Sequence, residues 1–191
     1  MNLLECAKKI EPCQRNWDET YVVPDEHVDY ITEVCTTVPT KQNRNVYSLV
    51  CIKDRKTIEK IFEVAYEPTE KYTTYKKNSQ VLANTLFIWI PGQEPAEYKD
   101  DLDIAVGISS GAAALAAAEL GYSTGFCKCF VNRSVCKILR KNAGIKTKDV
   151  ILILGIGVPN NNYDSRQVVV DDRITAIKYS RGKKDIKIFK R

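Results

Sequence analysis

Residues 100–121, DDLDIAVGISSGAAALAAAELG, join an acidic start to a long run of small apolar residues. Three aspartates at the start are favourable near the positive end of a helix dipole, and Gly121 suits the position just after a helix. Between these ends the residues are small and apolar on almost every side, which is typical of a helix buried all round. The stretch therefore predicts a long buried helix that other parts of the fold approach closely.

The other patterns predict further helices and strands on both sides of this helix. Apolar residues at helical spacing indicate amphipathic helices, and runs of β-branched and aromatic residues indicate strands. The predicted helices cover 24–38, 55–67 and 133–144, and the predicted strands cover 46–52, 85–90, 149–159 and runs within 167–189. Residues 66–80 read as a polar surface loop and 121–130 as an extended or irregular connection. In the strand 149–159, Gly155 and Gly157 suggest that another segment packs close to the backbone.

Length and composition favour one soluble domain. The chain has 191 residues, is 44% hydrophobic and carries a net charge of +5. The N-terminal stretch lacks the apolar core of a signal peptide, and the apolar part of 104–120 is short for a bilayer and contains two serines. Seven cysteines without a secretory signal favour reduced thiols. We therefore expect a cytoplasmic protein with no membrane partner, and the modest charge makes a nucleic-acid partner unlikely.

The stretch GFCKCF, residues 125–130, raises the question of a metal or redox site. Cys127 and Cys129 are one residue apart and Cys136 follows, but zinc sites use wider pairs and need a fourth ligand. His27 is the only histidine, lies far off in the sequence and is expected on an exposed helix turn. The spacing also differs from the C-x-x-C of redox dithiols. We expect no metal, and small buried thiols are the simpler interpretation.

Four segments in order resemble the FMN-dependent nitroreductase family. They are RNWDETY at 15–21, PTKQNRNVYSLVCI at 39–52, DLDIAVGISSGAAALAAAELGYSTGFCKCF at 101–130 and VILILGIGVPN at 150–160. The resemblance implies one nitroreductase-like domain over 1–191 with an α+β fold, in which helices flank a central, mostly antiparallel sheet. It also implies a homodimer with the long helix at the interface, and FMN bound there.

The resemblance assigns cofactor-binding roles by position. Arg15 with Arg181 or Lys183 would hold the phosphate, and Asn78 or Gln80 would reach the pyrimidine edge of the flavin. The segment 127–129 would line the ring and present a backbone amide. The full set of implied cofactor-binding residues is Arg15, Asn16, Trp17, Thr40, Lys41, Asn43, Asn45, Asn78, Gln80, Cys127, Lys128, Cys129, Arg181 and Lys183, of which Thr40, Lys41 and Asn43 would come from the partner subunit.

Some positions depart from the family pattern. Trp17 stands where the family has serine, and Glu19 replaces a second basic residue, which adds repulsion toward a phosphate. Lys128 replaces an acidic residue, and a cation beside the ring would favour the reduced, anionic flavin. Val46 and Tyr47 replace Pro-Trp.

The resemblance implies ping-pong chemistry. NADH or NADPH would give hydride to flavin N5, and an acceptor such as a nitroaromatic or a quinone would take the electrons, without a catalytic side chain. Two alternatives stay open at this point. One is a flavin-binding or flavin-fragmenting family member without nitroreductase turnover, and the other is a small basic nucleic-acid-associated protein.

Overall fold

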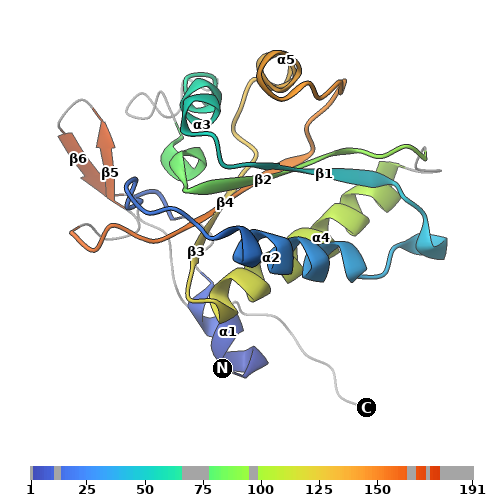
Figure 1. Ribbon diagram of the computed structural model, residues 1–191, viewed down its shortest axis with the longest axis horizontal. Coiled ribbons are helices and arrows are strands. Elements are labelled where there is room, and N and C mark those ends of the chain that lie inside the picture. Colours follow the sequence, from blue (N-terminus) through green and yellow to red (C-terminus); the bar gives the residue numbers. More distant parts are fainter. Residues whose placement is uncertain are drawn as a thin grey trace.

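The protein is built on a four-stranded antiparallel sheet with the order β1-β2-β4-β3 (Figure 1). A computed structural model describes residues 2–10, 14–65, 78–94, 99–162, 167–170 and 173–176. The strands are β1 (Tyr47–Ile52), β2 (Thr85–Pro91), β3 (Ser123–Cys127) and β4 (Leu152–Gly157). The fold is α+β, as predicted, and that all of 1–191 forms one domain stays a prediction.

Strand β2 lies in the middle of the sheet and is buried on both faces. Its residues alternate between two hydrophobic clusters, because successive side chains of a strand point to opposite faces. Leu86, Ile88 and Ile90 belong to one cluster, and Phe87 and Trp89 belong to the other. A strand with two buried faces has a continuous apolar sequence rather than an alternating one, which explains the run TLFIWI.

One face of the sheet is covered by α2 (Asp25–Thr37) and α4 (Lys99–Glu119), with α1 (Leu3–Lys9) beside them (Figure 1). Ser109, in the middle of α4, is buried and connects α4 to both β2 and α2. Its hydroxyl accepts a hydrogen bond from Trp89 Nε1 at 2.9 Å and donates to the Cys35 carbonyl of α2 at 2.8 Å. A serine in an apolar helix is tolerated here because both of its polar roles are satisfied.

Helix α4 is not buried on every side within one chain, which corrects the expectation from its sequence. Ile104 is 61% exposed and Ile108 is 44% exposed, and Gly107 between them is exposed as well. The sheet and α2 cover only the opposite side of the helix. By length and composition α4 is also the one membrane-span candidate among the described residues, and half of the span is buried in the fold.

The other face carries α3 (Arg55–Phe62), α5 (Asn132–Ala143) and the 3₁₀ turn η2 (Ser79–Leu82). Asp54 caps α3 by accepting from the backbone N–H of Thr57 at 2.9 Å. Gly144 ends α5 with a left-handed φ of 70°, and Gly121 ends the long helix with a φ of 88°. Both helix ends agree with the sequence prediction, because glycine accepts this conformation without a steric cost.

The glycines of β4 make room for η2 and the residues just after it, and the sequence predicted such a close approach. Gly155 pairs with Gly125 across β4 and β3, so two bare stretches of backbone lie side by side. A Cβ on Gly155 would lie 2.3 Å from the carbonyl oxygen of Gln80, and a Cβ on Gly157 would lie 2.0 Å from Asn84 Oδ1. The indole of Trp17 also lies against both Gly125 and Gly155.

Several predicted elements differ from the structure or lie outside its described part. Residues 123–127 form strand β3, so the extended alternative predicted for 121–130 holds for this part and the irregular one does not. Helix α1 was not predicted at all, and α3 ends at Phe62 rather than at residue 67. The strand runs expected in 167–189 are described only for the pair β5 (Gln167–Val170) and β6 (Arg173–Ala176), and most of the expected loop 66–80 lies outside the described residues.

Candidate functional site

The N-terminal segment 14–18 runs across the ends of β3 and β4, and backbone hydrogen bonds fix its path. Gln14 N donates to Thr124 O at 3.1 Å, Asp18 N donates to Val158 O at 2.9 Å, and Asn160 N donates to Asn16 O at 3.0 Å. Such bonds at both ends leave the backbone of the residues between them little freedom.

Trp17 anchors this segment to the core. It is 4% exposed, and its indole N–H donates to Ser79 O at 2.9 Å in η2. Trp17 therefore fixes the segment against η2, and this also fixes the backbone position of Arg15, two residues before it.

Arg15 begins a hydrogen-bond network that reaches β3. Its Nη1 donates to Asn78 Oδ1 at 2.7 Å. Asn78 Nδ2 then donates to Gln80 Oε1 at 2.8 Å and lies 3.4 Å from Cys127 Sγ, while Asn78 Oδ1 also accepts from Gln80 N at 3.1 Å. Four side chains that were predicted separately as cofactor-binding residues are thus in one connected cluster.

Asn78 has no remaining hydrogen-bonding capacity. Its amide has two N–H donors and two acceptor positions, and the network uses all of them. It is 5% exposed. Asn78 therefore holds Arg15 and Cys127 in fixed positions relative to each other.

The guanidinium of Arg15 is only partly satisfied by the protein. Its Nε is buried and has no hydrogen-bond partner among the residues that the structure describes, which is costly for a charged group. Arg15 lines a pocket of about 240 Å³ together with Asn16, Trp17, Glu19, Ser79, Leu82 and Asn160. A fixed cation that lines a pocket suits an anionic group such as a phosphate, so these residues fit the phosphate end of FMN.

Glu19 does not act as an isolated negative charge, which corrects the expected repulsion. Its carboxylate forms an ion pair with Arg55 Nη2, at the start of α3. Arg55 also donates to Leu82 O at 2.9 Å and lies 3.3 Å from Glu59. Arg55 carries no sequence signal of this role, because its place at the start of a helix does not indicate which carboxylate it will pair with.

The predicted residues of the segment 40–45 lie at the other end of the sheet. This segment includes the turn η1 (Lys41–Asn43) and precedes β1, whose Tyr47 pairs with Pro91 at the end of β2, whereas η2 leads into the start of β2. The two ends of β2 are about 20 Å apart. Within one chain, Thr40, Lys41, Asn43 and Asn45 therefore do not meet Arg15.

Local contacts hold the segment 40–45 in place. Lys41 pairs with Asp101 of α4 at 3.1 Å, and Thr40 Oγ1 donates to Arg44 O at 2.8 Å. Gln42 and Asn43 have positive φ values of 56° and 54°, a conformation that costs energy for residues other than glycine. Two such residues in succession give this exposed turn a defined shape.

The three clustered cysteines of the sequence form no shared site. Cys127 Sγ lies 3.7 Å from the Cys129 carbonyl oxygen, whereas Cys136 Sγ lies 3.3 Å from Asn132 Oδ1 in α5. Burial raises the pKa of the Cys136 thiol, which disfavours the thiolate that metals bind. In the part of the chain that is described, no group of three or more candidate metal ligands occurs. Lys128, between Cys127 and Cys129, is exposed.

His27, Arg181 and Lys183 lie away from this cluster or outside the described residues. His27 is half-buried rather than exposed, because its Nδ1 lies 2.6 Å from the hydroxyl of Tyr122. Arg181 and Lys183, predicted to help hold the phosphate, lie outside the described residues.

Comparisons with known proteins support the same interpretation of the fold. A nitroreductase family protein from Clostridium novyi NT has 17% identity and a TM-score of 0.68, over 87% of this chain and 90% of that one. An iodotyrosine deiodinase solved with FMN and 3-iodo-L-tyrosine has 18% identity and a TM-score of 0.67, over 97% and 98% of the two chains. A BluB-like flavoprotein from Clostridium difficile 630 has 20% identity and a TM-score of 0.67, over 86% and 93%.

Comparison of the sequence with protein families assigns the chain to a family. No curated protein matches the sequence, but the model of the nitroreductase family matches residues 13–158. This match begins just before Arg15, includes Asn78 and Cys127, and ends after β4. The chain therefore belongs to the nitroreductase family.

Proposed function

We propose that the protein is a cytoplasmic FMN-dependent oxidoreductase that uses NADH or NADPH to reduce nitroaromatics, quinones or related acceptors in a two-electron, ping-pong reaction. One observation carries the proposal: Arg15, with a buried Nε that has no partner, is joined through Asn78 to Cys127. Family membership supports it, and the fold is shared with a flavoprotein that binds FMN.

In this proposal Arg15 binds the phosphate of FMN by charge-assisted hydrogen bonds, with Asn16 and Trp17 forming the wall beside it. Arg181 or Lys183 would add a second cation. Asn78 orients the guanidinium, and Gln80, next to it, faces the flavin pyrimidine.

The segment 127–129 would lie against the flavin ring. FMN, when bound, supplies the chemistry of accepting hydride from a nicotinamide and passing two electrons to an acceptor. The backbone amide after Cys127 would donate to the ring, and the exposed side chain of Lys128 would add a positive charge beside it. No acid or base among the side chains is required, because hydride transfer needs positioning rather than proton transfer.

We further propose that the protein is a homodimer whose two α4 helices pack together. The exposed stripe Ile104, Gly107 and Ile108 is apolar and consists of one small residue between two large ones, which suits close helix packing. A second copy would also bring its Thr40, Lys41, Asn43 and Asn45 to the flavin site. The pocket at Arg15, about 240 Å³, is smaller than typical small-molecule sites of 300–1,000 Å³, as expected for a site that one chain only half provides.

Replacing Ile108 with glutamate is expected to convert the dimer to monomers and to abolish FMN binding. A charge at the centre of an apolar interface loses its hydration without gaining a partner. Multi-angle light scattering after size exclusion gives the mass, and FMN fluorescence gives the binding. Val22→Glu is the matched control, since Val22 is also an exposed apolar side chain, at 73%, but is not on α4. A dimer that survives in the Ile108 variant would exclude this interface.

Absorbance of the purified protein tests the proposed function. The protein should be yellow, or become yellow with added FMN, and anaerobic NADH or NADPH should bleach it. A yellow protein that neither donor bleaches would instead be a flavin-binding or flavin-fragmenting member of the family. A protein that stays colourless after incubation with FMN would contradict both functions.

A further inference from the structure

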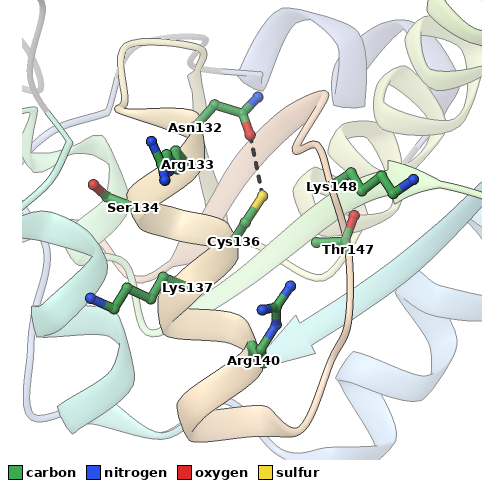
Figure 2. A pocket seen from close by; sticks show the side chains of 8 residues that line it. All are labelled: Asn132, Arg133, Ser134, Cys136, Lys137, Arg140, Thr147 and Lys148. Carbon is green, nitrogen blue, oxygen red and sulfur yellow. Dashed lines mark hydrogen bonds between the residues drawn. The ribbon is translucent and has the colours of Figure 1, made fainter.

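A second, larger pocket lies beside α5, and none of the residues predicted to hold flavin lines it. Its volume is about 890 Å³, and Figure 2 shows it between α5 and the segment 145–150 that returns to β4. The cationic residues that line it are Arg133, Lys137 and Arg140 of α5 and Lys148 of the returning segment. The thiol of Cys136 lies between them on α5.

No described carboxylate pairs with the four cations. Asp149, next to Lys148 in the chain, does not line the pocket, and its carboxylate accepts a hydrogen bond from Asn132 Nδ2. The pocket therefore carries a surplus of positive charge, although the chain as a whole has a net charge of only +5.

The pocket has a fixed shape, because α5 and the returning segment are fastened to each other. Asn132, at the start of α5, donates to Val150 O at 3.1 Å and accepts from Val150 N at 3.1 Å. Thr147 Oγ1 donates to Asp149 O at 2.8 Å. Gly144, with its left-handed φ, turns the chain back at the other end of α5. A site that exists before the ligand arrives loses less entropy on binding.

We propose that this pocket binds a compact ligand that carries a chain of two or three phosphates, such as a nucleoside polyphosphate. Arg133, Lys137 and Arg140 are spaced four and three residues apart, so they follow one face of the helix over about 10 Å. Their long side chains give one pocket several cationic donors, and guanidinium and ammonium groups bind phosphates by charge-assisted hydrogen bonds. Figure 2 shows Arg140 extending from α5 toward the wall that carries Thr147 and Lys148.

The shape of the site favours a small molecule over nucleic acid. A volume of about 890 Å³ lies within the range of small-molecule pockets. A nucleic-acid strand needs a groove that continues past the protein, with aromatic platforms or a long basic track. No aromatic residue lines this pocket.

Calorimetric titration of the full-length protein with ATP and, separately, with inorganic tripolyphosphate tests the proposal. We expect one site per chain and about tenfold weaker binding for Arg140→Gln and for Lys137→Gln, since each removes one charge-assisted contact at a partly solvated site. Lys141→Gln is the matched control, because Lys141 is an exposed cation of α5 that does not line the pocket. Equal affinity for the two probes would mean that the phosphates alone are recognised. Tighter binding of ATP would mean that the nucleoside also contributes.

Three results would overturn the proposal. The first is no saturable binding of either probe, and the second is the same loss in the Lys141 variant as in the Arg140 variant. The third is a higher affinity for a mixed-sequence single-stranded oligonucleotide than for ATP, with several protein copies bound to each oligonucleotide. Arg15→Gln separates this pocket from the proposed flavin site: binding of tripolyphosphate should be unchanged in that variant, whereas its loss would place the probe at Arg15 instead.

Discussion

Replacing Gly155 with alanine should destabilise the protein by about 3 kcal/mol or more, because the added methyl group has no space. Its Cβ would lie 2.3 Å from the Gln80 carbonyl oxygen and 2.8 Å from Ala83 Cβ. The first of these atoms is backbone and cannot rotate away, so η2 must move. A displaced η2 also loses the contact of Trp17 with Ser79. Urea unfolding followed by tryptophan fluorescence measures the change in free energy.

A double variant identifies which of the two close contacts matters. Ala83→Gly removes the side-chain contact of the Gly155 variant but leaves the Gln80 carbonyl in place. We therefore expect the double variant to be no more stable than the single variant. Full recovery of stability in the double variant, or a single variant as stable as the unmodified protein, would show that η2 can move at little cost in free energy. In that case η2 would not be the rigid support that the position of Arg15 requires.

The sequence allowed good prediction of elements whose signal is local. The amphipathic pattern of 133–144 gave α5, and the two glycines of 149–159 correctly indicated a close approach to β4. Helix α1 was missed although Asn2 and Glu5 form a capping box. It has only seven residues, which is too short for a clear amphipathic pattern. Its leucines, Leu3 and Leu4, are exposed rather than buried, so they do not mark a core-facing side.

The sequence could not predict features that depend on distant contacts. An apolar helix needs cover, but composition does not tell whether the same chain or a second copy provides it. The family resemblance predicted an interface on this helix, but only the tertiary structure shows that its uncovered side carries Ile104 and Ile108. The partners of Arg15 and Glu19 were also hidden, because Asn78 lies 63 residues and Arg55 36 residues away in the chain. Family resemblance named Arg15 and Asn78 as separate candidates, and the tertiary structure brings them together.

Arg15→Gln should weaken FMN binding by at least about tenfold, since a charge-assisted contact to phosphate contributes about 1.5–3 kcal/mol. Glutamine is shorter than arginine and does not reach Asn78 Oδ1, but that oxygen keeps the backbone N–H of Gln80 as a donor, so the variant should keep its fold, which circular dichroism checks. Arg15→Lys should also bind weakly, because one ammonium group does not reproduce a planar guanidinium that contacts Asn78 through Nη1 and can offer its other N–H groups to a phosphate. Quenching of FMN fluorescence during titration gives the affinity.

Arg140→Gln is the control for this experiment, since it also removes one arginine but lies in the pocket beside α5. It should leave FMN affinity unchanged and weaken tripolyphosphate binding, whereas Arg15→Gln should do the reverse. This opposite pattern can arise only if the two cations belong to separate anion sites. A general effect of net charge would weaken the binding of both ligands in both variants. Unchanged FMN affinity in the Arg15 variant would remove Arg15 from the flavin site, and the buried Nε without a partner would then need another anion to explain it.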